Sequence, residues 1–284
     1  MRARVPASTS NIGPGFDVLG LALGLYIEVS VEDADQLTLT TEGEGSELAR
    51  EASHLAVKVA SAIRGHDRLA IHVNSEIPLG RGLGSSAALV AATAAAAGAD
   101  DPLSVAATSD GHAENAAASV LGGLVAATFV DGRPVARRLP LDSELAFVVI
   151  VPDRELATKT ARSLLPESVP FKDAVSNLGR MGLLIAGLGD RLALVPGAGT
   201  DRLHQDARSV LFPEAPKLLK RLREAGAVVS CWSGAGPSLL GICTSEEAAG
   251  WVVEAAHDAL NESSLPGRVL LLRPDIDGLI LRQS

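Results

Sequence analysis

The sequence predicts an α+β fold in two halves, and three observations lead to this prediction. Strand candidates occur as neighbours joined by short turns, as in 124–130 and 133–139, which is typical of antiparallel pairs. One strand, 68–74, leads through a glycine-rich loop into an alanine-rich helix. Beyond residue 150 the composition changes to a basic, helix-like segment, so we divide the chain into 1–150 and 151–284.

Helices and strands of the first half follow from periodicity. Apolar side chains at 48, 52, 55, 59 and 63 would form one face of a helix over 47–64. Residues 146–151 are continuously apolar, which predicts a strand buried on both sides. The other elements expected here are strands around Val5 and over 25–31, a helix over 102–108 and a further helix ending at Gly122 and Gly123.

The second half combines helices with strand pairs. Three glycines interrupt its longest apolar helix, 173–188, which predicts close packing of that helix against a neighbour. The elements expected are helices over 154–167, 173–188, 213–225 and 245–260 and strands over 227–232, 239–243, 268–272 and 278–281.

The loop over 78–88 reads PLGRGLGSSAA and is the first candidate for function. Its glycines alternate, and glycine can adopt the backbone angles that turn several N–H groups toward one anion. One of the two serines is expected to cap the following helix, whose N-terminus favours negative charge. Loop and helix predict a polyphosphate site, although not a Walker A motif, because no lysine precedes the serines. The alternative is a glycine-rich turn that leads into a buried helix.

Composition limits the class of protein. The net charge of −9 argues against a nucleic-acid partner, whose binding depends on neutralising phosphates. Hydrophobic residues make up 47% of the chain, yet no apolar run is long enough to span a bilayer, and no leader peptide is recognised. Cys231 and Cys243 lack metal-ligand spacing and fit a reduced interior. We therefore expect a cytoplasmic protein with no membrane or nucleic-acid partner.

Two polar stretches of the first half allow an ordinary or a functional interpretation. Residues 7–17, ASTSNIGPGFD, form either a plain polar loop or a loop whose short side chains bind a small ligand. His112, within SDGHAEN, is interpreted as a surface or helix-capping histidine and not as a catalyst.

Three glycine-containing stretches, PASTSNIGPGFDVLG, PLGRGLGSSAA and SGAGPS, together resemble the GHMP small-molecule kinases. Further motifs are similar to the homoserine kinase branch of that superfamily: SNxGPGFDxLG, GHAENAAASVLGG, and TKTAR…LP followed by LHQDAR…LFP. The resemblance implies an N-terminal phosphate-loop domain and a ferredoxin-like C-terminal domain. It also implies transfer of the γ-phosphoryl group of ATP to the side-chain hydroxyl of homoserine, a step of threonine biosynthesis.

The resemblance assigns roles to individual residues. Asn11 would lie near the reacting hydroxyl, Asp17 near the substrate ammonium, and Asn115 in the same pocket. Arg162 and Arg208 would bind the substrate carboxylate, for which a guanidinium fork is well suited. The ATP phosphates would be wrapped by Pro78, Leu79, Gly80, Arg81, Gly82, Leu83, Gly84, Ser85, Ser86, Ala87 and Ala88.

The predicted chemistry needs little covalent help from the protein. Ser85 or Ser86, with Asp110, would hold Mg²⁺. Thr158 and Lys159 lie one turn before Arg162 in sequence and could approach the γ-phosphate or the hydroxyl. No residue is assigned as the general base. Asp17 is a carboxylate in the right motif, so the role of base stays open for it.

The chain departs from the family pattern in three places. Asp110 stands where the family often has glutamate, Glu114 lengthens the acidic side chain before Asn115, and His54 replaces an asparagine near the adenine. The partners expected are homoserine and ATP, with a homodimer left open. The alternatives are another GHMP kinase acting on shikimate or mevalonate, and a catalytically silent sugar or nucleotide sensor on the same fold.

Overall fold

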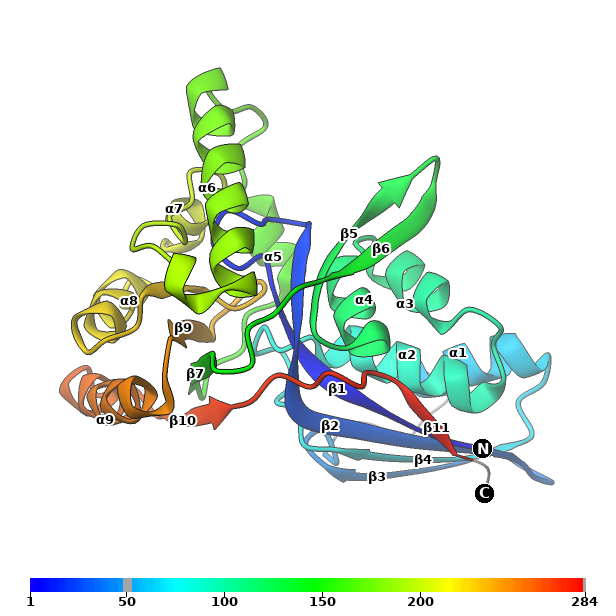
Figure 1. The fold of residues 1–284 in the computed structure, drawn as a ribbon. Coiled ribbons are helices and arrows are strands. Elements are labelled where there is room, and N and C mark those ends of the chain that lie inside the picture. The colour runs from blue at the N-terminus through cyan, green and yellow to red at the C-terminus, as the bar shows by residue number, and fades with distance from the viewer. Residues whose placement is uncertain (48–52, 283–284) are drawn as a thin grey trace.

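The computed structural model describes residues 1–47 and 53–282 as two β-sheets with helices packed on them (Figure 1). Within those residues, the first sheet has seven strands in the order β11-β1-β2-β4-β3, with β5 paired to β2 and β6 paired to β5. These strands are β1 (Arg2–Ser10), β2 (Leu19–Asp33), β3 (Thr38–Gly43), β4 (Leu69–Ser75), β5 (Leu124–Val130), β6 (Arg133–Leu139) and β11 (Ile280–Arg282). Every pairing is antiparallel except that of β3 with β4.

The second sheet confirms the predicted ferredoxin-like half. Its four strands, in the described part of the chain, have the order β10-β7-β9-β8 and pair antiparallel throughout. Helices connect β7 to β8 and β9 to β10, which gives the β-α-β-β-α-β order of that fold. The strands are β7 (Ala146–Pro152), β8 (Val229–Trp232), β9 (Leu239–Cys243) and β10 (Gly267–Leu272).

The helices of each half pack on their own sheet. In the first half α2 and α4 lie on the first sheet, α1 packs beside α2, and α3 packs on both α2 and α4. In the second half α8 and α9 cover the outer face of the second sheet, while α6 projects from the body of the molecule in Figure 1. Their bounds are α1 (Leu55–Arg64), α2 (Ser85–Ala97), α3 (Pro102–Asp110), α4 (Glu114–Leu121), α5 (Thr158–Ser163), α6 (Phe171–Gly189), a 3₁₀ turn (Arg191–Ala193), α7 (Gln205–Arg208), α8 (Ala215–Glu224) and α9 (Glu246–Glu262).

Strand β7 joins the cores of the two halves. Side chains alternate across a strand, so Phe147, Val149 and Val151 face the core that continues into the first half. Their neighbours Val148 and Ile150 face the core formed with α8 and α9. The prediction of a strand buried on both sides is confirmed, since every residue of β7 is buried.

The boundary drawn after residue 150 therefore falls inside β7. The end of the chain also returns to the first half, where β11 pairs with β1. The two halves thus share a hydrophobic core, and the last strand of the chain returns to the sheet of the first half. They are not connected as separate bodies by a linker.

Several sequence-based expectations need correction. Strand β1 extends through Ser10, so residues 7–10 of the predicted 7–17 loop are strand. Pro6, which has no N–H to donate, stands where the register of β1 with β2 shifts. Strand β3 was not predicted, although its alternate residues Leu39 and Thr41 are buried. The helix expected over 47–64 begins at Leu55; residues 48–52 of that prediction lie outside the described residues.

Two helices differ from their predictions for local reasons. Helix α2 is capped by Gly84 and not by a serine, because the chain enters it in the left-handed conformation, with φ of 68°. Of the helix predicted over 154–167, only the part that forms α5 (Thr158–Ser163) is helical. The prediction of close packing at the glycines of α6 is wrong for Gly179 and Gly182, where an added Cβ would meet no atom of the described residues within 4 Å. The prediction is right for Gly187, which packs against Leu194.

Three separate segments meet where the sheets adjoin. The backbone N–H of Ser8 donates to the carbonyl of Leu83 over 3.1 Å. The N–H of Gly234 donates to the carbonyl of Ser10 over 2.9 Å. The hydroxyl of Ser233 lies 2.7 Å from the Gly82 carbonyl, to which it donates. The ends of β1, the 78–88 loop and the turn between β8 and β9 therefore form one hydrogen-bonded junction.

No helix within 1–47 and 53–282 combines the length and the apolar character that crossing a membrane requires.

We expect Ser233→Ala to lower the free energy of unfolding by about 1 kcal/mol, because it leaves the half-buried Gly82 carbonyl without that donor. Ser238→Ala in the same turn is the matched control: its hydroxyl is buried without a partner, so its removal should cost little or stabilise the protein. Chemical denaturation of both variants measures the difference. Equal losses would show that the Ser233 hydroxyl does not join the segments.

Candidate active site

A cleft of about 340 Å³ opens at this junction, with residues of both halves in its walls. Its lining contains most of the predicted site residues, including Asn11, Asp110, Asn115, Arg162 and Arg208. The full lining is Ser10, Asn11, Gly80, Gly82, Gly84, Ser85, Ser86, Ala87, Ser109, Asp110, His112, Glu114, Asn115, Leu156, Ala157, Thr158, Arg162, Arg208, Gly234 and Ala235.

The glycine loop forms one end of the cleft. Gly80, Gly82 and Gly84 all have positive φ, between 61° and 73°, so the alternating left-handed backbone predicted for an anion nest is present. Close contacts also require two of these glycines: a Cβ on Gly82 would lie 2.2 Å from the Ser233 carbonyl oxygen, and one on Gly84 would lie 2.0 Å from Ser8 Oγ. No side chain caps α2, so its first N–H groups stay available beside the loop.

Only part of the predicted phosphate-binding stretch lines the cleft. Leu83 and Ala88 are buried in the core, and Pro78 is buried as well. The Arg81 guanidinium turns toward Glu155 and the Leu79 carbonyl. Because glycines alternate with larger residues, the backbone faces the cleft while the side chains between the glycines point away.

A serine and a carboxylate meet beside the start of α2. Ser86 Oγ donates to Asp110 Oδ1 over 3.1 Å, so Ser86, one of the two serines considered, is the one bonded to Asp110. Burial raises the pKa of Asp110 and outweighs the opposing effect of nearby His112. Among the described residues no group of three or more His, Cys, Asp or Glu side chains could hold a metal ion.

His112, interpreted from the sequence as a surface or helix-capping histidine, lines the cleft. Its Nδ1 lies 3.0 Å from Oε1 of Glu114, a side chain that is only 1% exposed. Burial lowers the pKa of His112, but the contact with Glu114 outweighs burial and leaves that pKa raised. Asn115 stands beside this pair and is fixed by Ser8 and Ser10, which lie 3.0 Å from its Oδ1 and Nδ2.

Two arginines also line the cleft. Arg162 and Arg208 are 46 positions apart, yet their guanidinium carbons lie 5.5 and 5.3 Å from the centre of the same ring, that of Phe16. The cation–π geometry holds both charges near one point. Arg162 also pairs with Asp17 in two hydrogen bonds of 3.0 and 2.5 Å.

Arg208 is a buried cation, since only 1% of the residue is exposed. Its guanidinium donates to His204 Nδ1 and to the Gly234 carbonyl, each over 2.9 Å, and its Nε has no partner among the described residues. No carboxylate of the described residues forms an ion pair with it. Burial, with a smaller contribution from the charge of Arg162, lowers the pKa of Arg208 to about 10.

His204 connects Arg208 to the N-terminal loop. A carbonyl can only accept and a guanidinium can only donate, so Nε2–H must donate to the Gly13 carbonyl (2.8 Å) and Nδ1 must accept from Arg208. The imidazole is therefore neutral, in agreement with burial, which lowers the pKa of His204 to about 4. Its ring stacks on Phe16 with centroids 5.0 Å apart.

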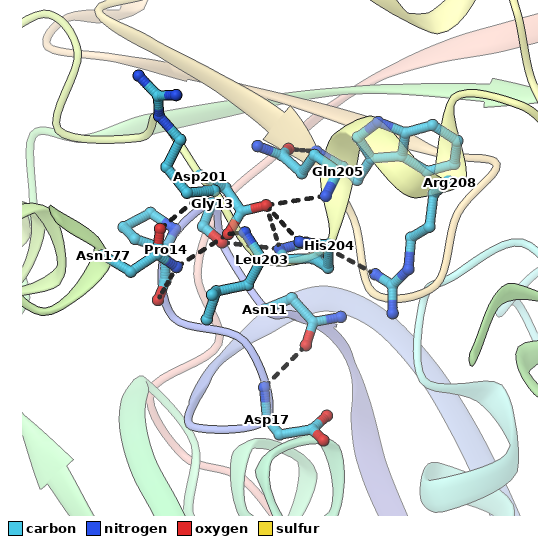
Figure 2. Close-up of polar contacts among 12 residues, drawn as sticks. Asn11, Gly13, Pro14, Asp17, Asn177, Asp201, Leu203, His204, Gln205 and Arg208 are labelled. Atoms are coloured by element: carbon cyan, nitrogen blue, oxygen red, sulfur yellow. Dashed lines mark hydrogen bonds and ion pairs between the residues drawn. The ribbon is translucent and has the colours of Figure 1, made fainter. Parts of the chain in front are cut away.

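Asp201 fixes the segment that carries His204. Figure 2 shows its carboxylate directed at the backbone N–H groups of the next turn. The donors are the N–H groups of Leu203, His204 and Gln205 and the side-chain amide of Asn177, at distances of 2.7 to 3.0 Å. Asp201 thus acts as an N-terminal cap that holds the short helix α7 in place.

Asn11 and Asp17 occupy a strained turn. Both have positive φ, 69° and 53°, which asparagine and aspartate tolerate better than most residues. Asn11 Oδ1 accepts from the Asp17 N–H over 3.0 Å, as drawn in Figure 2, and its Nδ2 donates to the Gly234 carbonyl. Asn11 lines the cleft, whereas Asp17 is absent from its lining and reaches it only through Arg162.

The two remaining predicted residues behave differently. Thr158 lines the cleft at the start of α5. Lys159 is exposed and does not line the cleft.

A smaller hollow shares Ser85 with the cleft and contains His54. Its walls are mainly apolar, from Ile27, Val73 and Leu89. His54 Nδ1 accepts from the Ala56 N–H over 3.2 Å and so caps α1. Burial lowers the pKa of His54, which favours the neutral ring.

Comparison with known proteins decides the family. A model of the GHMP kinases N terminal domain matches residues 48–127, and a model of the GHMP kinases C terminal domain matches residues 171–262. A homoserine kinase of Streptomyces coelicolor is 42% identical over 266 residues, which cover 87% of this chain and 86% of that protein. The chain belongs to the homoserine kinase family of GHMP kinases.

Further members agree with this assignment. A homoserine kinase of Streptomyces avermitilis is 41% identical over 288 residues, covering 94% of each protein. The crystal structure of homoserine kinase from Cytophaga hutchinsonii superimposes with a TM-score of 0.85 at 28% identity, over 99% of this chain and 96% of that one. The resemblance stated from the sequence motifs is therefore confirmed.

Sequence reasoning missed several residues of this homoserine kinase family site. His204 was quoted only within a motif, and Phe16 was not singled out. Only the fold brings their rings into a stack, because 188 positions separate them. His112 and Glu114 offered a better signal, since they immediately precede the predicted Asn115.

Because the pKa of His204 falls from 6.5 to about 4 on folding, the unfolded chain binds a proton between these values that the folded chain does not. The free energy of unfolding should therefore fall as the pH is lowered from about 6.5 to about 4, by on the order of 3 kcal/mol from this group. His204→Phe, which keeps a ring on Phe16, should lose this contribution in denaturation measured across the pH range.

Exposed His257 on α9 provides the control, and His257→Asn should keep the wild-type slope. If wild type and His204→Phe show the same slope, His204 is not the neutral acceptor of Arg208.

Proposed function

We propose that this protein transfers the γ-phosphoryl group of ATP to the side-chain hydroxyl of L-homoserine, producing O-phospho-L-homoserine and ADP. The observation that carries the proposal is the charge pattern of one cleft. Its glycine loop and the N-terminus of α2 suit a polyphosphate, and two arginines that flank Phe16 also line it. Membership of the homoserine kinase family supports the same substrate.

Arg208 is the main reason to propose a carboxylate-bearing substrate. A buried charge is costly unless an opposite charge accompanies it, and the partners of Arg208 are a neutral imidazole and a carbonyl. The nearby Arg162 adds repulsion. A substrate carboxylate between the two guanidinium groups would relieve both effects and could accept from the free Nε of Arg208.

The reaction needs the hydroxyl oxygen to lie in line with the γ-phosphorus. A bond then forms from that oxygen to phosphorus, the bond from phosphorus to the ADP oxygen breaks, and the hydroxyl proton is lost. Asn11, Asn115 and Thr158 line the cleft and are proposed to orient the hydroxyl and the γ-phosphate. No general base is assigned.

Mg²⁺ is proposed at Asp110 and Ser86. The donor set fits, because it offers a carboxylate and a hydroxyl oxygen beside the phosphate loop, and Mg²⁺ prefers oxygen ligands while keeping waters and phosphate oxygens. The bound ion would neutralise charge on the phosphates. It would also stabilise the ionised form of Asp110, which burial otherwise disfavours.

The hollow beside Ser85 is proposed to receive the adenine. Its apolar walls suit a planar base, and the neutral His54 supplies an N–H at the Nε2 position in place of the family's asparagine amide. The two free, buried cysteines agree with the reducing cytoplasm, where we place this step of threonine biosynthesis.

Shikimate and mevalonate carry a carboxylate but no ammonium, and galactose carries neither, so these alcohols separate the alternatives. ADP release should be observed with ATP and homoserine and remain at background with the other three. Release with shikimate or mevalonate alone would assign another GHMP kinase activity. Binding of ATP without release for any alcohol would favour the sensor.

Arg208→Lys should raise the KM for homoserine about tenfold or more, because an ammonium cannot reproduce two guanidinium hydrogen bonds. The KM for ATP should change little, since the proposed phosphate site consists of the glycine loop and the N-terminus of α2 and does not include Arg208. The KM for homoserine methyl ester should rise less than the KM for homoserine, because the ester has no carboxylate charge for Arg208 to bind. Equal losses for acid and ester would mean that Arg208 does not bind the carboxylate.

Asp110→Asn should lower activity at limiting Mg²⁺, and high Mg²⁺ should recover part of the loss, because the variant keeps its size but loses the ligand charge. Ser86→Ala should shift the Mg²⁺ requirement in the same direction, and Ser85→Ala should shift it less. Activity of Asp110→Asn that equals wild type at limiting Mg²⁺ would remove Asp110 from the metal site.

A further inference from the structure

Two groups proposed to recognise opposite ends of the substrate are bonded to each other. Arg162 donates to both carboxylate oxygens of Asp17, over 3.0 and 2.5 Å. The pair joins the halves of the molecule, since Asp17 follows β1 and Arg162 lies on α5. About a third of each side chain is exposed, 33% for Asp17 and 34% for Arg162, so the pair is accessible to a ligand.

This pairing conflicts with simple docking of the substrate. While the pair stays closed, each oxygen of Asp17 already accepts from Arg162, so a substrate ammonium at Asp17 would have to share the carboxylate with a guanidinium of like charge. The same two bonds direct two of the five N–H donors of Arg162 toward Asp17 and away from a substrate carboxylate. Opening of the pair removes this competition and lets homoserine pair fully with both residues.

Arg208 differs from Arg162 in being held by neutral partners. His204 and Gly234 fix its guanidinium, and neither has to be displaced by an arriving carboxylate. Arg162 instead lies on a helix of six residues and is held on one side by an anion that can be exchanged. The movable part of the arginine pair is thus Arg162, with Arg208 as the fixed part.

We propose that Asp17 and Arg162 form a latch that a zwitterion opens without a net loss of ion pairing. The substrate ammonium replaces Arg162 at Asp17, and the substrate carboxylate replaces Asp17 at Arg162 while also binding Arg208. One ion pair is exchanged for three, those of the ammonium with Asp17 and of the carboxylate with each arginine. The inference rests on the proposed function and adds to it a reason for selecting α-amino acids.

A ligand with one charge cannot make this exchange. A carboxylic acid without an ammonium that takes Arg162 leaves Asp17 unpaired beside the cleft. An amine without a carboxylate that takes Asp17 leaves Arg162 and Arg208 facing each other with no anion between them. Each of these ligands must therefore open the Asp17–Arg162 ion pair without replacing both of its halves, and it also lacks one charged contact of the zwitterion.

The latch predicts that one substitution at Asp17 weakens the binding of the zwitterion and tightens the binding of a carboxylate without an ammonium. A simple contact between Asp17 and the ammonium predicts only the first change. Asp17→Asn should weaken homoserine binding about tenfold or more. The same variant should tighten the binding of 4-hydroxybutyrate, which is homoserine without its ammonium, by roughly tenfold, because Arg162 is already free. If Asp17 only contacts the ammonium, the affinity for 4-hydroxybutyrate stays unchanged. Asparagine tolerates the positive φ of 53° at this position, so the backbone is preserved.

Calorimetric titration of the full chain with homoserine, 4-hydroxybutyrate and 3-aminopropan-1-ol measures these affinities. Glu155→Gln is the matched control, since it removes one negative charge close to the loop without touching Arg162, and it should leave all three affinities near wild type. Arg162→Gln tests the other side: it frees Asp17 and should tighten 3-aminopropan-1-ol while weakening homoserine.

Unchanged or weaker binding of 4-hydroxybutyrate to Asp17→Asn, together with unchanged or weaker binding of 3-aminopropan-1-ol to Arg162→Gln, would overturn the latch. This outcome is distinct from failure of the proposed function, which would appear as wild-type protein that releases no ADP with homoserine.

Discussion

The hydrogen bond from the Ser233 hydroxyl to the Gly82 carbonyl is the contact on which the site depends. It ties the glycine loop of the first half to the turn between β8 and β9, and Ser233 Oγ also lies 2.8 Å from the hydroxyl of Thr9. A side chain at Gly82 would collide with this turn, so the approach of the two backbones requires glycine there. The cleft exists because the halves are held this closely without their side chains filling the space between them.

The electrostatics of the cleft oppose those of the whole molecule. The chain carries a net charge of −9, yet the cleft presents a helix N-terminus and two guanidinium groups. Burial makes these local fields strong, because little water screens them. The acidic residues of the lining, Asp110 and Glu114, face Ser86 and His112 respectively, and so do not cancel the charge of Arg208 directly.

Features that depend on residues close together in the sequence were predicted correctly, whereas features that depend on contacts between distant residues were missed or wrong. The strands 124–130 and 133–139 were predicted with the bounds of β5 and β6, because alternation and a tight turn are local signals. Strand β3 was missed since its short, polar sequence becomes a strand only by pairing with β4. The serine cap of α2 was wrong for a similar reason: the left-handed entry at Gly84 follows from the nearness of Ser8, which lies 76 positions earlier. Arg162 and Arg208 came from a motif, but the neutral His204 that holds one and the Asp17 that holds the other required the fold.

Strand β11 gives the assembly of this protein a fixed order. It pairs with β1 through Arg282 and Arg2, so the edge of the first sheet is completed by residues synthesised after the entire second half (Figure 1). Until then β1 presents an open edge, and open edges are sites of mispairing between chains. The sheet of the first half is therefore complete only after the second half has been synthesised.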